Sequence, residues 1–402
     1  MMRRRIALLV VLLMVSCTWN TLHKKEVETM KAAFTLRYGG KPALWPVVVG
    51  LKEELDIFSV PTENAVGTNS MNNAITLLRF AGDQIQYDEV KRDFIEGVGS
   101  GDKYYPGIFS DEWIGYTQTR GFLLFNLREK TFADHIPVKS GDQYFKNVAV
   151  FDAQKLQFVF HVHEAYFHDG IRYLKLLEFD GKGGYITLSE IKTGKDEVGY
   201  SEPWAIQNKT IFIYNNDSTR ITAYDMQFTP VAHPFCDLFN NLKDFRRLDQ
   251  LVIHPTLPIA ILVEIKDIGR GGYKVYLANW GNPDPEKQFI ELLAQEISLF
   301  SGPEINRLSV SGFQFSPGGD WLVFRDNSER TRSVTNPLFV AMPVDGSKQL
   351  PLGKPHILGK VLRENAYPTS TAWIKQPVSF VVCDGQVVYK WELGQLAREF
   401  GE

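Results

Sequence analysis

Short apolar runs separated by tight turns dominate the second half of the chain. Residues 315–324 (FSPGGDWLVF) contain two such runs on either side of a turn at 316–320. A third run covers 338–342, and a fourth lies around 356–358, beyond an Asp-Gly turn. Short apolar and aromatic runs bounded by Gly, Pro, Asn and Asp are typical of β-strands. The pattern therefore predicts one up-and-down unit of four short antiparallel strands.

Weaker copies of this unit recur along the chain. They recur at intervals of roughly 50 to 60 residues, slightly longer than the ~40–50 residues of a propeller blade. Their second strands begin near Phe158, Ile211, Ala260, Leu322 and Phe380. One four-stranded sheet cannot bury both of its faces alone, whereas radially stacked sheets cover one another and leave only short edges. The sequence therefore predicts an all-β fold, a β-propeller of about seven four-stranded blades, with six or eight as alternatives.

The two ends of this repeat array are less regular than its middle. Early blades are expected from six further runs, at 55–60, 74–80, 84–89, 107–117, 121–127 and 132–136. Residues 235–248 have a helical pattern and are expected to form an insertion between blades. The last unit stops after its third strand, near Leu393. We expect residues 47–51 to supply the missing outer strand and so close the ring.

The unit at 315–346 resembles the repeat of TolB-type β-propellers, in which an FSPDG turn precedes an apolar strand and a strand that ends in Asp-Gly. The residues that carry the resemblance are Phe315, Ser316, Pro317, Gly319, Trp321, Phe324, Asp345 and Gly346. Gly318 stands where that repeat has Asp, and residues 254–258 (HPTLP) are a degenerate copy of the turn. The final VVYKWEL is similar to the Trp-Asp strand of WD repeats, with Glu392 in the Asp position. The resemblance implies that Pro and Gly set the turns and that Trp and Phe pack between blades.

The N-terminus has the pattern of a bacterial signal peptide. A basic stretch at 1–5 precedes an apolar run at 6–15, which is shorter than the ~20 residues of a membrane-spanning helix. The run ends in Met-Val-Ser-Cys, which resembles the lipobox of bacterial lipoproteins and implies cleavage before Cys17 and lipidation of its thiol. Thr18, in place of Asp, implies sorting to the outer membrane. Secretion without a lipid and an uncleaved anchor are the alternatives.

These features predict four parts: a signal peptide at 1–16, a lipid-attached tether at 17–44, a β-propeller at 45–395 and a C-terminal tail at 396–402. The aromatic content of 13% favours half-buried strands. With 44 Lys and Arg against 47 Asp and Glu, the formal charge is −3. The chain therefore has no basic field that would attract nucleic acid.

Two cysteines remain besides Cys17. Cys236 and Cys383 lie far apart in the sequence, and Cys383 belongs to an apolar strand pattern. Two buried free thiols are expected. A Cys236–Cys383 bridge is the alternative, because an oxidising cell envelope would permit one.

One group of residues has the composition of a metal site. His161 and His163 are two residues apart and so share one face of a strand, while His168 and Asp169 follow in the next hairpin. Imidazole and carboxylate groups are ligands for zinc and other transition metals. The spacing fixes no third or fourth ligand, so a polar hairpin with satisfied histidines is the favoured interpretation. We predict no metal and no cofactor.

No catalytic motif is present in the sequence. The glycine-rich segment 97–103 lacks the Gly-Lys-Ser/Thr of a phosphate loop, and the chain has no Gly-x-Ser-x-Gly elbow. We therefore expect a non-catalytic protein-binding scaffold, attached by a lipid anchor, with proteins of the cell envelope as partners. One alternative is a small-ligand, glycan or peptide binder, or an enzyme, that uses the central funnel. Another is a structural module of a larger secretion or surface assembly. The inner strands at 313–315 and 371–374 are mostly apolar, which favours the scaffold.

Overall fold

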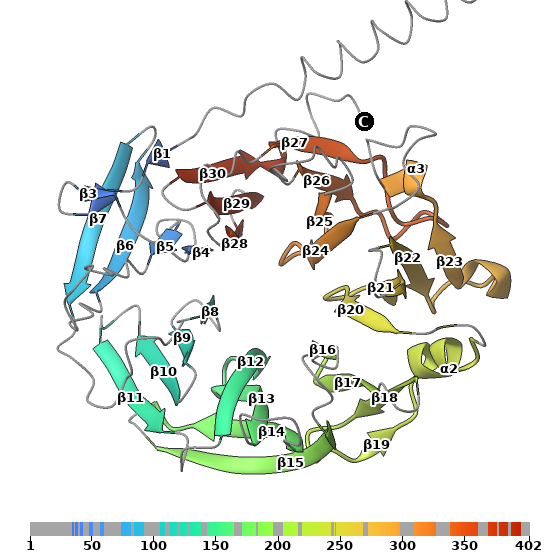
Figure 1. Cartoon of the computed structure of the whole chain (residues 1–402), viewed down its shortest axis with the longest axis horizontal. Helices are drawn as coiled ribbons and strands as arrows, with labels where there is room; N and C mark the ends of the chain where they lie inside the picture. Colours follow the sequence, from blue (N-terminus) through green and yellow to red (C-terminus); the bar gives the residue numbers. More distant parts are fainter. Residues whose placement is uncertain are drawn as a thin grey trace, which may run out of the picture.

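A computed structural model of the protein shows β-sheets arranged side by side in a ring (Figure 1). The residues that the structure describes are 34–35, 37–38, 41–42, 48–50, 57–59, 74–81, 84–91, 105–108, 113–118, 121–126, 129, 131–137, 143–164, 171–181, 184–195, 204–215, 219–242, 245, 247–267, 272–297, 309–326, 338–360, 369–375, 378–384 and 387–394.

Four consecutive blades lie between residues 143 and 360 of the described chain. Each blade is a four-stranded antiparallel sheet whose strands pair in sequence order, as the repeated pattern predicted. Their strands are β12 (Gln143–Asp152), β13 (Gln157–Glu164), β14 (Ile171–Phe179) and β15 (Tyr185–Lys195); β16 (Trp204–Gln207), β17 (Thr210–Asn215), β18 (Arg220–Tyr224) and β19 (Pro230–Val231); β20 (Leu248–Ile253), β21 (Ile259–Asp267), β22 (Gly272–Asn279) and β23 (Phe289–Leu292); and β24 (Val310–Phe315), β25 (Trp321–Asp326), β26 (Leu338–Pro343) and β27 (His356–Lys360).

Further four-stranded antiparallel sheets are established by backbone pairing at the two ends of the chain. Their strands are β4 (Val48–Gly50), β5 (Ile57–Ser59), β6 (Ala74–Ala81) and β7 (Gln84–Lys91); β8 (Tyr105–Ile108), β9 (Trp113–Gln118), β10 (Gly121–Asn126) and β11 (Thr131–Pro137); and β28 (Thr369–Lys375), β29 (Val378–Asp384), β30 (Val387–Glu392) and β1 (Phe34–Thr35). A small hairpin joins β2 (Arg37–Tyr38) to β3 (Lys41–Pro42).

The strand that completes the last sheet is not the one expected from the sequence. β1 pairs with β30, with Phe34 opposite Val388 and Thr35 opposite Val387. The assignment of residues 47–51 to this position is wrong, because Val48–Gly50 forms β4, the first strand of another sheet. A run of consecutive valines suits an inner strand that has neighbours on both faces.

The inner strands of successive sheets lie next to one another around the ring. Contacts join β4 to β8, β12 to β16, β16 to β20, β20 to β24 and β28 to β4. In Figure 1 these strands surround a common centre, and β15, β19, β23 and β27 lie on the outside. The first strand of each sheet is thus its inner strand.

The hydrophobic core lies between the blades. Successive residues of β25 point to opposite faces of their sheet. Phe324 packs in a buried cluster with Val263 of the β20–β23 blade, whereas Trp321 packs in a second cluster with Phe380 of β29. These two side chains confirm the expectation that the Trp and Phe of the repeat pack between blades.

Helices are few among the described residues. α2 (Pro234–Asn240) lies between the β16–β19 and β20–β23 blades, where the sequence predicted a helical insertion. The 3₁₀ helix η1 (Pro285–Lys287) precedes β23, and the single turn α3 (Ala294–Ile297) follows it. Within the described ranges, no helix is long and apolar enough to cross a membrane.

Candidate functional site

One end of the ring is built from the short turns of the four blades between residues 143 and 360. In an antiparallel sheet, the connection between the first and second strands and that between the third and fourth lie at the same end. We call this surface the turn face. Its described residues are those of the turns at 153–156, 180–181 with 184, 208–209, 225–229, 254–258, 280–288, 316–320 and 344–355.

Aspartates shape several of these turns. Asp225 Oδ1 accepts hydrogen bonds from the backbone N–H groups of Gln227 and Thr229, at 2.9 and 2.8 Å. Asp345 Oδ1 accepts one from the Ser347 backbone N–H at 3.0 Å and one from the Ser347 hydroxyl at 2.6 Å. The hydrogen bonds from Ser347 lower the pKa of Asp345. These carboxylates therefore replace missing backbone acceptors, the usual role of Asp in a tight turn.

The Ser-Pro-Gly-Gly-Asp turn is held by its serine. Ser316 is 1% exposed, and its Oγ accepts a hydrogen bond from the Trp321 backbone N–H at 3.1 Å. The Ser316 backbone N–H donates to Trp321 O at 2.8 Å, and the Gly319 N–H donates to Ser316 O at 2.9 Å. Gly319 has φ of +86°, the left-handed region that favours glycine. The motif residues thus define the local geometry of the turn face.

His254 connects two neighbouring blades across this face. Its Nδ1 accepts hydrogen bonds from the backbone N–H groups of Thr256 and Leu257, at 3.0 and 2.8 Å. Since Nδ1 is an acceptor, Nε2 carries the proton and donates to Gly319 O of the next blade, at 2.9 Å. The side chain is 2% exposed, and burial lowers its pKa, against the opposing effects of Gly319 O and Asp320. Both ring nitrogens are therefore committed to structural hydrogen bonds.

Further polar contacts extend the connection to the preceding blades. The Gln207 amide donates to the backbone carbonyls of His254 and Leu257, at 2.5 and 3.0 Å. One blade earlier, Lys209 Nζ lies 2.6 Å from Asp152 Oδ2. The hydrogen bond from Lys209 is the main reason why the pKa of Asp152 lies below its usual value. Hydrogen bonds and one ion pair thus link successive blades at this face.

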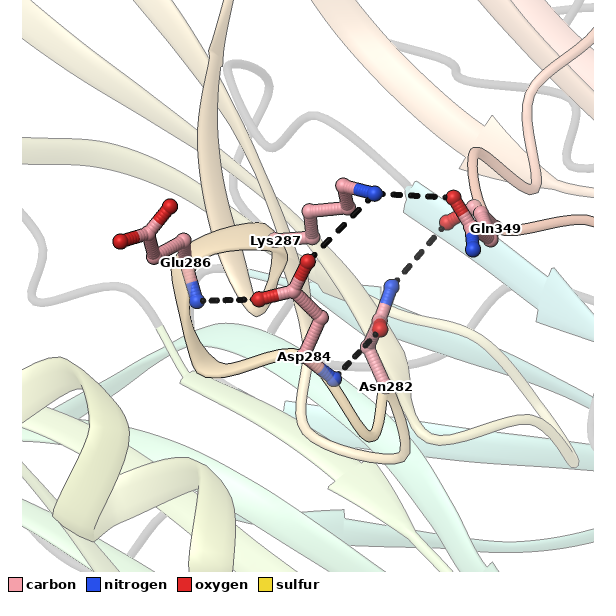
Figure 2. A network of polar contacts seen from close by, with 5 residues as sticks. All are labelled: Asn282, Asp284, Glu286, Lys287 and Gln349. Atoms are coloured by element: carbon pink, nitrogen blue, oxygen red, sulfur yellow. Dashed lines mark hydrogen bonds and ion pairs between the residues drawn. The ribbon is translucent and has the colours of Figure 1, made fainter.

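A second set of contacts joins the outer part of the same face (Figure 2). Asn282 Nδ2 donates to Gln349 O at 3.3 Å, and Lys287 Nζ donates to Gln349 Oε1 at 3.0 Å. Asp284 Oδ1 accepts from the Glu286 backbone N–H at 3.1 Å, and its other oxygen lies 3.4 Å from Lys287 Nζ. Figure 2 shows Lys287 and Asn282 both pointing toward Gln349 of the neighbouring blade. The network fixes two turns relative to each other.

Two glycines of the repeat allow the turns to approach closely. A Cβ at Gly319 would collide with the His254 ring. A Cβ at Gly346 would lie 2.8 Å from Leu257 Cδ2, closer than van der Waals contact permits. Both glycines therefore leave room for the 254–258 turn of the preceding blade.

The inner strands use polar side chains to join one another. Gln250 Oε1 accepts from the Phe313 backbone N–H at 3.4 Å, and Gln314 Nε2 donates to Thr371 Oγ1 at 2.6 Å. Each bond crosses from one blade to the next. These side-chain amides therefore hold adjacent inner strands together.

The histidine group is only partly described. His161 and His163 both lie on β13, and His161 is 1% exposed. His168 and Asp169 lie outside the described residues. Within the part of the chain that the structure describes, no group of three or more His, Cys, Asp or Glu is placed to hold a metal ion.

The other candidate residues have different outcomes. Cys236 is a buried free thiol, as expected, and burial raises its pKa to about 12. Cys17 and the glycine-rich segment 97–103 lie outside the described residues. His254 and Gln207 were not identified from the sequence as connecting residues. The signal that points to His254 is its place in HPTLP, the degenerate copy of the Ser-Pro-Gly-Gly-Asp turn.

No family model matches this chain. A search of curated proteins also finds no match. Solved structures similar to it include the β-propeller domain of the Trilobed protease from Pyrococcus furiosus, with 8% identity, coverage of 87% of this chain and 94% of that chain, and a TM-score of 0.50. A protein from Lactobacillus plantarum shares 10% identity over 89% of this chain and 90% of its own, with a TM-score of 0.48. Dihydro-heme d1 dehydrogenase NirN in complex with DHE shares 11% over 81% and 69%, with a TM-score of 0.40. The first of these similarities agrees with the β-propeller fold of the blades described above.

Proposed function

We propose that this protein is a lipid-anchored β-propeller of the bacterial outer membrane that binds other envelope proteins and catalyses no reaction. Cys17 is the proposed lipid attachment site, and the turn face is the proposed docking surface. The lipobox-like Met-Val-Ser-Cys at the end of the apolar leader supports the anchor. The TolB-like repeat at 315–346 supports a role among envelope proteins.

The observation that carries the docking proposal is the linked arrangement of the turns. His254, Gln207, Lys209 and Gln349 connect each described blade to the next through hydrogen bonds or an ion pair. Loops positioned by a rigid scaffold are common binding sites. A surface that is ordered before a partner arrives loses less conformational entropy on binding. Hydrogen bonds and an ion pair connect the turn face across four blades, which supports a surface that is ordered before binding.

We further propose that the ring contains seven blades. The described strands pair into four-stranded sheets from β4 to β30, with β1 as the outer strand of the last sheet. Contacts of β28 with β4 place the last and first sheets side by side. This arrangement supports seven blades over the alternatives of six or eight.

Capture of the intact protein from gently solubilised envelopes, after amine-reactive cross-linking, tests the proposal. We expect one envelope protein to be recovered in stoichiometric amount, cross-linked through lysines of the turn face such as Lys209 and Lys348. Lys192, which is exposed on the outer strand β15, is the matched control and should not cross-link to that partner.

Two outcomes would contradict the proposal. Cross-links confined to Lys192 would place the docking surface on the outside of the ring. Recovery of a glycan, peptide or other small molecule without a protein partner would favour a binder or enzyme that uses the central funnel.

A further inference from the structure

Two histidines, the half-buried His233 and the buried His254, lie at the two boundaries of the β20–β23 blade. His233 lies at the boundary with the β16–β19 blade, and His254 lies at the boundary with the β24–β27 blade. Both use Nδ1 to accept a backbone hydrogen bond. Neither can accept that bond when Nδ1 is protonated.

His233 begins helix α2 and packs against both blades. It is the N-cap residue, and its Nδ1 accepts a hydrogen bond from the Phe235 backbone N–H at 3.2 Å. Its ring centre lies 4.8 Å from that of Phe212 on β17 and 5.7 Å from that of Trp280, which directly follows β22. Protonation would remove the cap and place a charge between two aromatic rings that are part of the inter-blade core.

His254 has a larger set of bonds to lose. A proton on Nδ1 would face the N–H groups of Thr256 and Leu257, which now donate to it. The 254–258 turn also receives the two hydrogen bonds from Gln207 and packs against Gly346. Loss of its geometry would therefore weaken contacts with the blades on both sides.

The charged groups that face the two histidines are few. Among the residues that the structure describes, Asp237 of α2 acts on His233, and Asp320 of the β24–β25 turn acts on His254. Phe212 and Trp280 around His233, and Phe315 at 4.9 Å from His254, are uncharged. Burial lowers the pKa of both histidines, and the single carboxylate near each acts in the opposite direction.

We propose that the β20–β23 blade is an acid-sensitive segment of the ring, held to both neighbours by histidines that must be neutral. At neutral pH the two Nδ1 acceptors keep α2 and the 254–258 turn in place. In acid, protonation of His233 and His254 releases this blade from its neighbours before the rest of the ring opens.

The direction of the pH effect follows from linkage. Each histidine has a lower pKa in the closed blade than in an open one, where the usual value is about 6.5. The closed state is therefore fully stabilised above about pH 6.5 and loses stability as the pH falls below it. Each such histidine increases the opening equilibrium by up to about tenfold per pH unit in that range.

Hydrogen exchange of the full-length protein, measured by mass spectrometry between about pH 7.5 and pH 5, tests the proposal after correction for intrinsic exchange. The test variant is His233→Asn combined with His254→Asn. Asparagine is a good N-cap residue, and its Oδ1 can accept from the N–H two residues ahead, as Asp225 does from Gln227. The variant thus keeps an acceptor at both sites and removes the titrating group. His356→Asn, on β27, is the matched control.

In the natural protein, we expect opening of residues 248–292 to increase about tenfold or more in acid, relative to residues 171–195. The His356→Asn protein should behave in the same way, whereas the double variant should change less than about twofold. An equal increase in the double variant, or an equal increase at 171–195, would overturn the proposal.

If the double variant does not fold, titration of the natural histidines by NMR replaces it. Protonation of His233 and His254 without loss of protection at 248–292 would then overturn the proposal.

Discussion

Side chains that alternate along one strand stabilise two different interfaces in this protein. On β25, Leu322 and Phe324 are buried against the preceding blade, while Trp321 and Val323 are buried against the following one. A period of two residues is the geometric consequence of the pleated strand. Because both faces are covered, the strand is apolar from Trp321 to Phe324, and a single substitution there affects one junction of the ring.

Trp321→Ala should destabilise the protein by about 3–5 kcal/mol, because it removes a large side chain from the core between blades. Trp321 is 7% exposed and packs in the cluster that contains Phe380. Chemical denaturation followed by circular dichroism measures the change. Tyr185→Ala, at a side chain that is 39% exposed, is the control and should have a much smaller effect. Equal unfolding midpoints for the natural and Trp321→Ala proteins would show that this cluster does not support the ring.

Helix α2 completes the edge of a blade whose outer strand is very short. β19 has two residues and pairs with Ala223 and Tyr224 of β18. At Ile221 of β18, the Asn240 side chain bonds to the backbone in place of a strand. Its Oδ1 accepts from the Ile221 backbone N–H and its Nδ2 donates to Ile221 O, both at 2.9 Å. The amide reproduces the donor and acceptor that a neighbouring strand would offer. A helix thereby protects an otherwise exposed strand edge.

Asn240→Ala should lower the free energy of unfolding by about 1–3 kcal/mol, because it leaves a backbone N–H and C=O of β18 without their partner. Thermal unfolding compared with the natural protein measures the effect. Asn241→Ala is the matched control, since Asn241 is exposed at the end of the same helix. A loss of stability in the control as large as that in Asn240→Ala would mean that the helix end, and not the amide pair, is responsible.

At the scale of the whole molecule, the first and last strands that the structure describes pair in one sheet. β1 is the outer strand beside β30, and β28 lies next to β4 of the first sheet.

Cys17→Ala should release the protein from the membrane, because lipid chains on that thiol are its proposed attachment. Fractionation of cells into membrane and soluble parts, followed by immunodetection, measures the distribution. Cys236→Ala is the control and should leave the distribution unchanged, since Cys236 is a buried thiol of the propeller. Retention of the Cys17→Ala protein in the membrane would contradict the lipoprotein proposal.

Local chemistry explains why much of the fold was predictable. The strands and turns around 315–324 were expected because Ser316, Gly319 and the alternating apolar residues act within a few positions of one another. The candidate site was less predictable. His254 bonds to Gly319 across 65 positions, and nothing in HPTLP specifies that partner. Residues 47–51 were assigned to the wrong position because their apolar pattern fits both the inner and the outer strand of a sheet.

By itself, the sequence determined that this chain forms repeated four-stranded sheets, where its tight turns lie and which side chains are buried. Strand pairing and turns depend on neighbours within one blade, and the side chains to be buried are recognisable from the apolar strand pattern, although it is the adjacent blades that bury them. Only the tertiary structure decided that β1 joins β30, that the turns of successive blades bond to one another and that α2 covers the edge of β18. These contacts join segments that become neighbours when the sheets stack around a common centre, so their partners are selected by the geometry of the ring.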